Sequence, residues 1–207
     1  MRLSPFSTSA FLIKIYKFLL TLGGEHTVSA GPARAIAEKY GSFSMLTIDA
    51  HLDLRSDYQE SRWSHACVLR RIHEEHDVTL GYCGIRSVAA VEVPYMKEHG
   101  IQPLMATDIG RPGWIDRILA GLREHVYLSI DVDGLDPSIL PGTGTPEPGG
   151  MLYRELLELL RAVVQERHVV AADCVELAPI AGQQTSEFTT AKILAKLIGA
   201  LVRKGGG

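Results

Sequence analysis

The sequence predicts an α/β fold with helices on both faces of a mainly parallel sheet. Short apolar runs alternate with longer helix-like segments along the chain, which is the rhythm of repeated strand–helix–strand units. Ionisable residues gather directly after several of the apolar runs, and parallel sheets bind their ligands at the carboxyl ends of their strands. A chain of 207 residues, 46% of them apolar, is expected to form one domain over residues 1–207.

Six strands and six helices follow from this rhythm. The strands are expected at Phe18–Leu22, Ser44–Ile48, Val78–Tyr82, Pro103–Ala106, Val126–Ile130 and His168–Ala172. The helices are expected at Ala33–Tyr40, His65–His76, Val88–His99, Trp114–Glu124, Tyr153–Glu166 and Glu187–Val202. The last two helices carry apolar stripes that belong in the core. The stripes are Leu156, Leu157, Leu160, Val163 and Val164, and Ile193, Leu194, Leu197, Ile198 and Leu201.

Charge and cysteine content narrow the function classes. The formal net charge is −3, so no basic field favours nucleic acid or an anionic membrane, and a small molecule is the expected partner. Lys14 and Lys17 follow an apolar patch at residues 10–13 before it reaches the length of a signal or anchor. The three cysteines, far apart and odd in number, predict reduced thiols in the cytoplasm. They are Cys67, Cys83 and Cys174.

The stretch Ser44–Asp53 concentrates the chemistry. It reads as a buried strand followed by three ionisable residues at alternate positions, which point the same way in extended backbone. They are Asp49, His51 and Asp53. Three ionisable groups on one face at the end of a core strand are costly to bury unless a cation lies among them. A second alternating pair follows the strand near residue 130, and a histidine follows the first strand. These are Asp131, Asp133 and His26.

Together these residues provide four carboxylates and two imidazoles. Two divalent cations would balance that charge, and a carboxylate-rich donor set suits manganese better than zinc. A water between two such ions loses a proton near neutral pH and can attack an electrophilic carbon. The competing interpretation is that the aspartates cap helices and form turns, as Asp136 before Pro137 does. That interpretation leaves two alternating sets and a histidine at three strand ends unexplained.

Four strings resemble one known family. These are "GGEH", "DAHLD", "SIDVDGLDPSILPGTGTPEPGG" and "DCVEL", which are similar to motifs of the ureohydrolases, the binuclear manganese enzymes that include arginase and agmatinase. The resemblance runs from about Gly23 to the last helix. It implies an arginase-like three-layer α/β/α sandwich with two Mn²⁺ ions per chain. One ion would be held by His26, Asp49, Asp53 and Asp131, and the other by His51 and Asp133, with Asp49 and Asp131 bridging.

The resemblance also implies the substrate and its helper residues. The interval Leu54–Ser64 has no Ser-Gly-Asn type element such as arginase-like relatives use for the amino-acid end of arginine, and "PGTGTPEPGG" looks like agmatinase. Agmatine, hydrolysed to putrescine and urea, is therefore the expected substrate, with guanidinobutyrate or arginine as alternatives. Glu176 matches the acid that pairs with the guanidinium, and a planar cation with paired donors suits a carboxylate. Thr145 is expected to contact the guanidinium or Glu176. His65 resembles the histidine that shuttles protons near the leaving amine.

The chain departs from the family pattern in two places. Position 25 is Glu where the family more often has Asp, and only residues 1–22 precede the first motif, where family members carry further strand and helix units. The N-terminal portion of the family domain is thus expected to be missing, which leaves a sheet edge open. One alternative is therefore an inactive homologue that serves as a metal-binding or assembly subunit. Another, a metal-dependent deacetylase, would need a mononuclear zinc site. The family implies a homo-oligomer, a trimer or hexamer.

Overall fold

The computed structural model describes residues 18–205, so the apolar patch at residues 10–13 and the two lysines after it lie outside the described part of the chain. The strands are β1 (Leu19–Leu22), β2 (Phe43–Ile48), β3 (Val78–Ile85), β4 (Leu104–Met105), β5 (His125–Asp131) and β6 (His168–Val175). They form one six-stranded sheet in the order β1-β6-β5-β2-β3-β4. Every pairing is parallel, as predicted.

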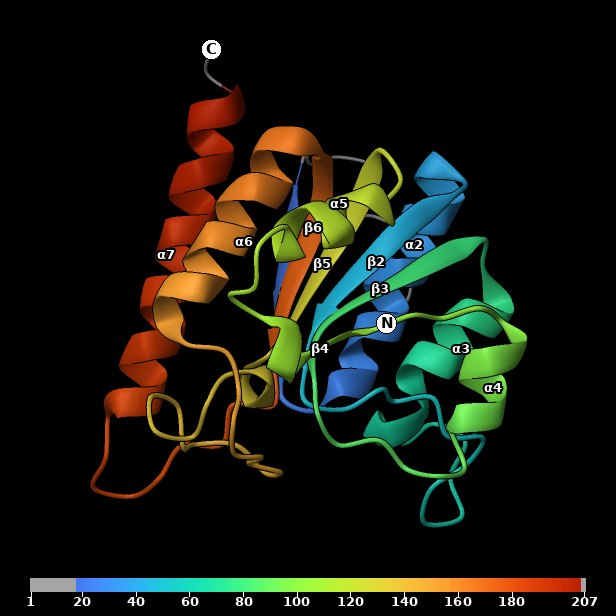
Figure 1. The fold of residues 1–207 in the computed structure, drawn as a ribbon, viewed down its shortest axis with the longest axis horizontal. Coiled ribbons are helices and arrows are strands. Elements are labelled where there is room, and N and C mark those ends of the chain that lie inside the picture. The colour runs from blue at the N-terminus through green and yellow to red at the C-terminus, as the bar shows by residue number, and fades with distance from the viewer. Residues whose placement is uncertain (1–17, 206–207) are drawn as a thin grey trace, which may run out of the picture.

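Helices cover both faces of this sheet, which makes three layers (Figure 1). One layer contains α2 (Ala30–Tyr40), α3 (Val68–Glu75) and α4 (Val93–Glu98), and the other contains α5 (Trp114–Ala120), α6 (Tyr153–Glu166) and α7 (Thr185–Gly205). All six residues of β2 are buried. Phe43 and Met45 pack in the core beneath α2 and α3, whereas Leu46 and Ile48 pack beneath α5, α6 and α7. A strand covered on both faces needs such a continuous apolar run.

Three of the predicted helices are shorter in the structure or begin with a different kind of turn. The helix expected over Val88–His99 is limited to α4, which has a proline in its first turn, where the missing N–H costs nothing. The helix expected over His65–His76 begins with the 3₁₀ turn η2 (His65–Cys67) and continues as α3. The helix expected over Trp114–Glu124 ends at Ala120, and Gly121 follows it; glycine is a poor helix former.

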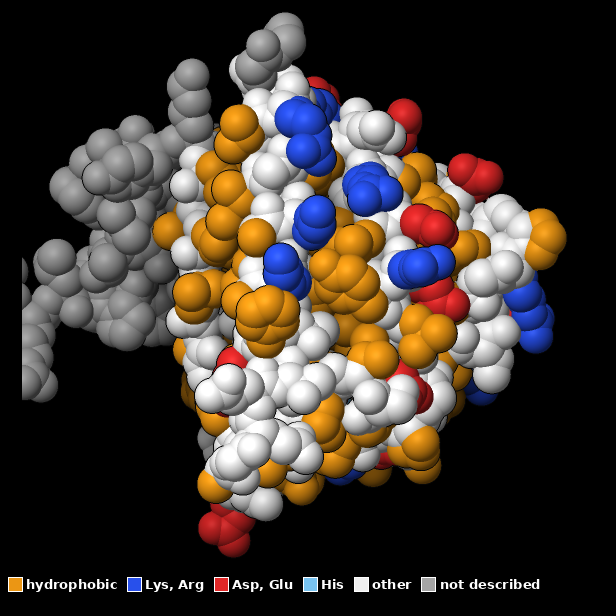
Figure 2. Space-filling view, turned by 90° about the vertical axis from the view of Figure 1, so that its left-hand side faces the viewer, with side chains coloured by type: hydrophobic (Ala, Val, Ile, Leu, Met, Phe, Trp, Pro, Cys, Tyr) orange, Lys and Arg blue, Asp and Glu red, His pale blue; other side chains and the backbone are white. Residues whose placement is uncertain are grey.

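The C-terminal helix α7 is longer than predicted, and its buried stripe is narrower. Ile193 and Leu197 are buried as expected, but Ile198 is 45% exposed. Figure 2 shows the outer face of the molecule on this side, where lysine and arginine side chains stand among hydrophobic ones. Phe188 and Val202 of α7 are also exposed. None of the helices in residues 18–205 combines the length and apolar character needed to cross a membrane.

The strand order creates a switch point between β2 and β5. From β2 the chain moves outward to β3 and β4, and from β5 it moves the opposite way to β6. The two strands pair in register up to Ile48 and Ile130, so the residues that follow them emerge side by side. Crevices at such switch points are the usual ligand sites of open α/β sheets. The fold therefore brings both predicted acidic sets to one place.

Candidate metal centre

A local hydrogen bond orients the side chains of the Asp-x-His and Asp-x-Asp pairs. Asp49 follows β2, and its Oδ1 atom accepts a hydrogen bond from the backbone N–H of His51 at 2.6 Å. Asp131 ends β5, and its Oδ1 atom accepts from the backbone N–H of Asp133 at 2.9 Å. Aspartate often binds the backbone two residues on. Each such bond fixes one carboxylate oxygen and leaves the other to face the site.

Asp53 reaches the same place by a turn. The residues after β2 do not continue as a strand, and Asp53 has a left-handed backbone with φ 53°. Aspartate is one of the few non-glycine residues that adopt this conformation with some frequency. The prediction that Asp53 joins the other two by strand alternation was therefore wrong in its reason, although the three side chains do gather at one edge.

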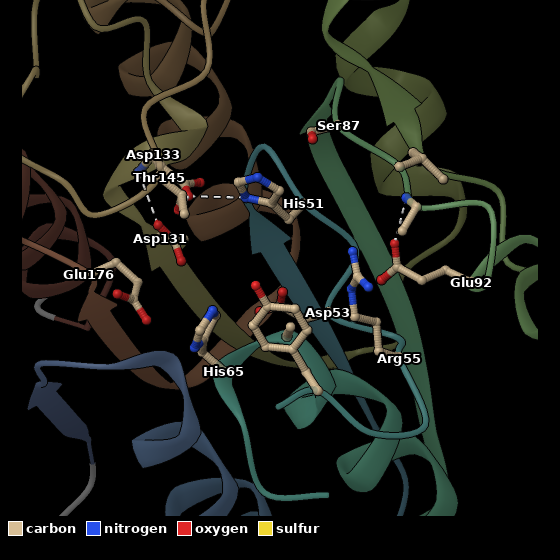
Figure 3. A pocket seen from close by; sticks show the side chains of 14 residues that line it. His51, Asp53, Arg55, His65, Ser87, Glu92, Asp131, Asp133, Thr145 and Glu176 are labelled. Carbon is tan, nitrogen blue, oxygen red and sulfur yellow. Dashed lines mark hydrogen bonds and ion pairs between the residues drawn. The ribbon is translucent and has the colours of Figure 1, made fainter. Parts of the chain in front are cut away.

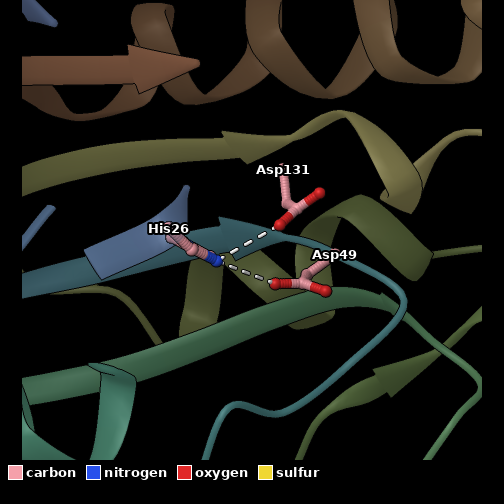
Figure 4. A group of neighbouring side chains, drawn as sticks. All are labelled: His26, Asp49 and Asp131. Carbon is pink, nitrogen blue, oxygen red and sulfur yellow. Dashed lines mark ion pairs between the residues drawn. The ribbon is translucent and has the colours of Figure 1, made fainter. Parts of the chain in front are cut away.

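His26 completes the first group of side chains. It begins the 3₁₀ turn η1 (His26–Ser29) after β1 and is fully buried. Figure 4 shows its ring pointing toward Asp49 and Asp131. The Nδ1 atom lies 3.0 Å from Asp53 Oδ2, 3.2 Å from Asp131 Oδ2 and 3.5 Å from Asp49 Oδ2. Three carboxylate oxygens thus surround one ring nitrogen.

Two of these buried atoms have no hydrogen-bond partner among the described residues. They are His26 Nδ1 and Asp49 Oδ2. A buried polar atom left unpaired is costly, and its presence calls for an explanation. A cation placed where these atoms converge would satisfy both, and imidazole with carboxylate oxygen is a donor set for hard to borderline divalent ions. The residues present therefore fit a metal ion.

The far side of the His26 ring fixes which nitrogen faces the site. Its Nε2 atom lies 3.0 Å from Ser129 Oγ, and Ser129 donates its own proton to Asp173 at 2.7 Å. The serine oxygen therefore accepts from Nε2–H, which leaves the lone pair of Nδ1 for a cation. Ser29 and Tyr127 also donate to Asp173. Asp173 lies inside β6, which extends beyond the predicted end at Ala172 to Val175.

A second group lies next to the first. The ligand atoms of Asp49, His51 and Asp133 lie within 4.8 Å of one another, as do those of His26, Asp49 and Asp131. His51 Nδ1 is 3.1 Å from Asp133 Oδ2 and 3.6 Å from Asp49 Oδ1. All six predicted side chains therefore meet at one edge of the sheet, with Asp49 common to both groups. Bridging by Asp131, and the division of the residues between two ions, stay predictions.

The Gly-rich run after β5 borders the second group. Thr145 donates its hydroxyl proton to Asp133 Oδ2 at 2.8 Å, so its contact is with a candidate ligand and not with Glu176. Glu147 Oε1 lies 3.8 Å from His51 Nε2. His51 is thus flanked by Asp133 at one ring nitrogen and by Glu147 at the other.

Glu176 follows β6 and lines a cavity together with His51, Asp131 and Asp133. Its backbone is left-handed, with φ 63°, and its N–H donates to the Gly24 carbonyl at 2.6 Å. Its Oε1 atom accepts from the backbone N–H of His26 at 2.7 Å. A strained backbone of this kind persists where its surroundings hold it in place. No arginine or lysine among residues 18–205 pairs with Glu176, so its carboxylate remains available to a cationic ligand.

His65 stands at the start of η2 and lines the cavity with Glu176 (Figure 3). Its Nδ1 atom lies 3.7 Å from Glu25 Oε1, so the longer acid at position 25 reaches the ring. Ser64 makes no side-chain cap of this turn. The cavity has a volume of about 240 Å³, which suits a small ligand. Its further lining includes Arg55, Tyr58, Ser87 and Glu92.

The cluster strongly perturbs its own protonation. Burial raises the pKa of Asp131, and the nearby Asp133 carboxylate raises it further, to about 8. Burial lowers the pKa of His51, but hydrogen bonds to Asp133 and Asp49 outweigh it and raise the value to about 11. Burial also lowers the pKa of His26, but the contacts with the Asp131 and Asp53 carboxylates outweigh it and raise the pKa well above its ordinary value. Without cations, therefore, the acidic cluster holds protons that the unfolded chain would release.

These shifts predict how the stability of the metal-free protein depends on pH. The folded chain keeps a proton on Asp131 up to about pH 8 and on His51 up to about pH 11, whereas the unfolded chain loses these protons near the ordinary side-chain pKa values of 3.8 and 6.5. The folded state then binds more protons, so its stability falls as pH rises. We expect the unfolding temperature of the metal-free protein to fall between about pH 6 and about pH 9.

Calorimetry on chelated and metal-loaded samples tests this expectation. Metal ions replace the protons, so apparent metal affinity should rise over the same pH interval. An unfolding temperature that rises with pH in the metal-free sample would contradict the account.

Several residues around the site were not identified from the sequence. Ser129 is a polar residue in the buried middle of β5, a signal that could have indicated a buried hydrogen-bond network. Arg86, just after β3, binds the loop that carries Asp133. The Arg86 side chain and the Asp133 backbone carbonyl are 47 residues apart in sequence, so no local sequence pattern predicts this contact.

The fold and the site together define an α/β protein whose central strands present carboxylates and imidazoles to a metal-binding crevice. Residues 7–201 match the family model described as the arginase family, and the chain belongs to this family. The resemblance to ureohydrolases is confirmed.

The chain is also similar to individual members of the family. It is 39% identical over 186 residues to the N(1)-aminopropylagmatine ureohydrolase of Synechocystis, covering 88% of this chain and 60% of that protein. It is 39% identical over 182 residues to the agmatinase of Pyrococcus horikoshii, covering 88% and 62%. The solved proclavaminate amidino hydrolase of Streptomyces clavuligerus has a TM-score of 0.89 and 30% identity, covering 96% of this chain and 69% of that one. The chain thus spans about three fifths of the length of these two curated relatives.

Proposed function

We propose that this chain hydrolyses a small guanidino compound to urea and an amine, with two divalent cations, Mn²⁺, held by the His26 and His51 groups. The observation that carries the proposal is the pair of metal-fitting groups sharing Asp49, with Glu176 and His65 lining the same cavity. When bound, the two ions lower the pKa of water to near neutrality and stabilise the negative charge that develops during attack on the guanidinium carbon.

The protein side chains position the substrate. One Glu176 oxygen is held by the His26 N–H, and the other is directed to the cavity, where it accepts a charge-assisted hydrogen bond from the guanidinium. This contact holds the central carbon of the guanidinium beside the metal-ligand cluster. The cavity of about 240 Å³ suits a small guanidino substrate.

His65 handles the proton that the reaction moves. Hydrolysis breaks a C–N bond, and the departing amine must gain a proton, which the imidazole of a histidine can supply. The Glu25 carboxylate at 3.7 Å favours the ring orientation that faces the cavity. Metal retention does not depend on this residue, because His65 belongs to neither metal-fitting group.

The proposed substrate is agmatine, which yields putrescine and urea. The names of the Synechocystis and Pyrococcus relatives support a decarboxylated guanidine with a cationic tail. Guanidinobutyrate, arginine and N(1)-aminopropylagmatine are the competitors to include in an assay. A cytoplasmic location is part of the proposal and rests on three buried cysteines without disulfides. A homo-oligomer rests on family resemblance alone.

A metal count combined with a urea assay tests the function. The purified chain, loaded with manganese, should retain two ions and release urea from at least one of the four guanidines. Bound metal without urea from any of them would favour the inactive metal-binding homologue. Absence of bound metal would refute the proposal at its base.

Replacing His65 tests its assigned role separately. His65→Ala is expected to keep both ions and to slow urea release about tenfold, since the side chain is 42% exposed and buffer can replace part of a proton shuttle. His76→Ala, at the end of α3 and outside the cavity, is the matched control. Loss of metal in the His65 variant would contradict the assignment.

A further inference from the structure

Arg86 forms an unusual set of contacts at the end of β3. Its guanidinium donates to the backbone carbonyls of six residues at 2.7–3.3 Å. These are Gly84, Asp133, Gly134, Leu135, Glu147 and Pro148. The side chain forms no ion pair within residues 18–205. A planar fork with five N–H donors is the one side chain able to bind so many carbonyls at once.

The carbonyls come from three segments that are far apart in sequence. Gly84 belongs to β3, residues 133–135 form the turn after β5, and residues 147–148 belong to the Gly-rich run. Arg86 thus ties together the turn that carries Asp133 and the run that carries Thr145 and Glu147.

Both tied segments contact His51. Asp133 Oδ2 lies 3.1 Å from its Nδ1 atom, and Glu147 Oε1 lies 3.8 Å from its Nε2 atom. Thr145 joins the two segments through its hydrogen bond to Asp133. The His26 ring is supported separately, by Ser129 and Asp173 from β5 and β6, and the tied turn reaches its group only through the backbone N–H of Asp133 that Asp131 accepts. A change at Arg86 therefore acts first on the His51 half of the cluster.

The packing around the guanidinium leaves little room for an alternative arrangement. A Cβ atom added to Gly150 would lie 2.6 Å from Arg86 Nη2 and 2.6 Å from Asp136 N. Cβ atoms in proteins essentially never approach another atom this closely. Position 150 must therefore lack a side chain for the Gly-rich run to close over Arg86. The arrangement is therefore set by both residues.

We propose that Arg86 is a positioning residue for the His51 side of the metal centre, holding Asp133 and the Gly-rich run in the geometry that receives the second cation. The inference rests on the proposed function only in assuming that His51 and Asp133 bind a cation. Arg86 touches neither substrate nor metal; it acts through Asp133, Thr145 and Glu147.

Arg167 offers a matched control. It is half-buried like Arg86, and it also donates to backbone carbonyls, those of Leu119, Leu122 and Glu166. Its position just before β6 lies at the opposite, amino-terminal edge of the sheet. Lysine at either position keeps the charge and loses the planar fork. Both substitutions should lower the unfolding temperature, but only one should alter metal binding.

The test is a metal titration of the whole chain. Binding of Mn²⁺ is measured by calorimetry, and binding of Co²⁺ is measured by its visible spectrum. We expect Arg86→Lys to weaken one of two binding steps by about 10–100-fold, the usual effect of losing a supporting residue, and to change the Co²⁺ spectrum. Arg167→Lys should bind both ions as the unaltered chain does. Equal metal affinities and spectra in the two variants would overturn the inference.

A second variant covers the case in which Arg86→Lys does not fold. Gly150→Ala presses on the same guanidinium and should weaken the same binding step, whereas Gly121→Ala, whose new Cβ would meet its nearest atom at an ordinary 3.6 Å, should not. An unchanged second step in Gly150→Ala would overturn the inference. If the unaltered chain binds two ions but releases no urea, the proposed function fails while this test still decides the role of Arg86.

Discussion

Replacing Asp131 by asparagine is expected to abolish metal retention and urea release together. The side chain keeps its volume but loses the charge that faces His26 Nδ1 at 3.2 Å. We expect the rate to fall by more than about 10³-fold, since bound metal supplies both the nucleophile and several kcal/mol of charge stabilisation. Bound metal after chelation and dialysis, measured with urea release, checks the result.

The same variant separates loss of metal from loss of fold. In the metal-free protein Asp131 is already neutral up to about pH 8, so asparagine should leave the unfolding temperature unchanged or raise it. Asp77→Ala, which removes an exposed acid paired with Arg123, serves as control and should keep full metal content. An Asp131→Asn variant that retains two ions and activity would refute its assignment as a ligand.

Glu176→Gln is expected to reduce kcat/KM for the guanidine by about 10²-fold while both ions remain bound. A hydrogen bond to a charged group contributes about 1.5–3 kcal/mol, and glutamine keeps the shape but cannot balance the guanidinium charge. The loss should appear in binding and in turnover, because the same contact positions the reacting carbon. Steady-state kinetics with a metal count on each sample measures it.

A surface acid provides the matching comparison. Glu158 on α6 is exposed, and Glu158→Gln should behave as the unaltered chain does. If Glu176→Gln keeps its kcat/KM, the guanidinium must bind elsewhere in the cavity. If it loses metal, Glu176 supports the His26 turn more than it binds substrate, since its carboxylate also accepts from the His26 N–H.

Much of the candidate site could be predicted because its geometry depends on residues that are close together in the sequence. Asp49 and His51, like Asp131 and Asp133, are two residues apart, and a side chain that binds the backbone two residues on turns both toward one edge. Alternating strands and helices place those edges together at the switch point. The three-layer fold and the meeting of these four side chains therefore follow from short patterns, whereas Asp53 reaches the site by a left-handed turn.

The supporting residues could not be predicted because their partners are distant. Ser129 and Asp173 meet His26 only when β1, β6 and β5 lie side by side. The carbonyls that Arg86 binds have no side-chain signature at all. Thr145 illustrates the same limit, since the sequence placed it in the cavity but could not show that its hydroxyl binds Asp133.

The register between β2 and β5 has a kinetic consequence. Ile48 pairs with Ile130, so Asp49 and Asp131 become neighbours only after a loop of some eighty residues has closed. Contacts of such sequence separation form slowly, and the entropy of closing the loop must be lost before they contribute. Cations cannot be captured until this central pairing exists. They should therefore act mainly by lengthening the lifetime of the native state, and much less by accelerating refolding.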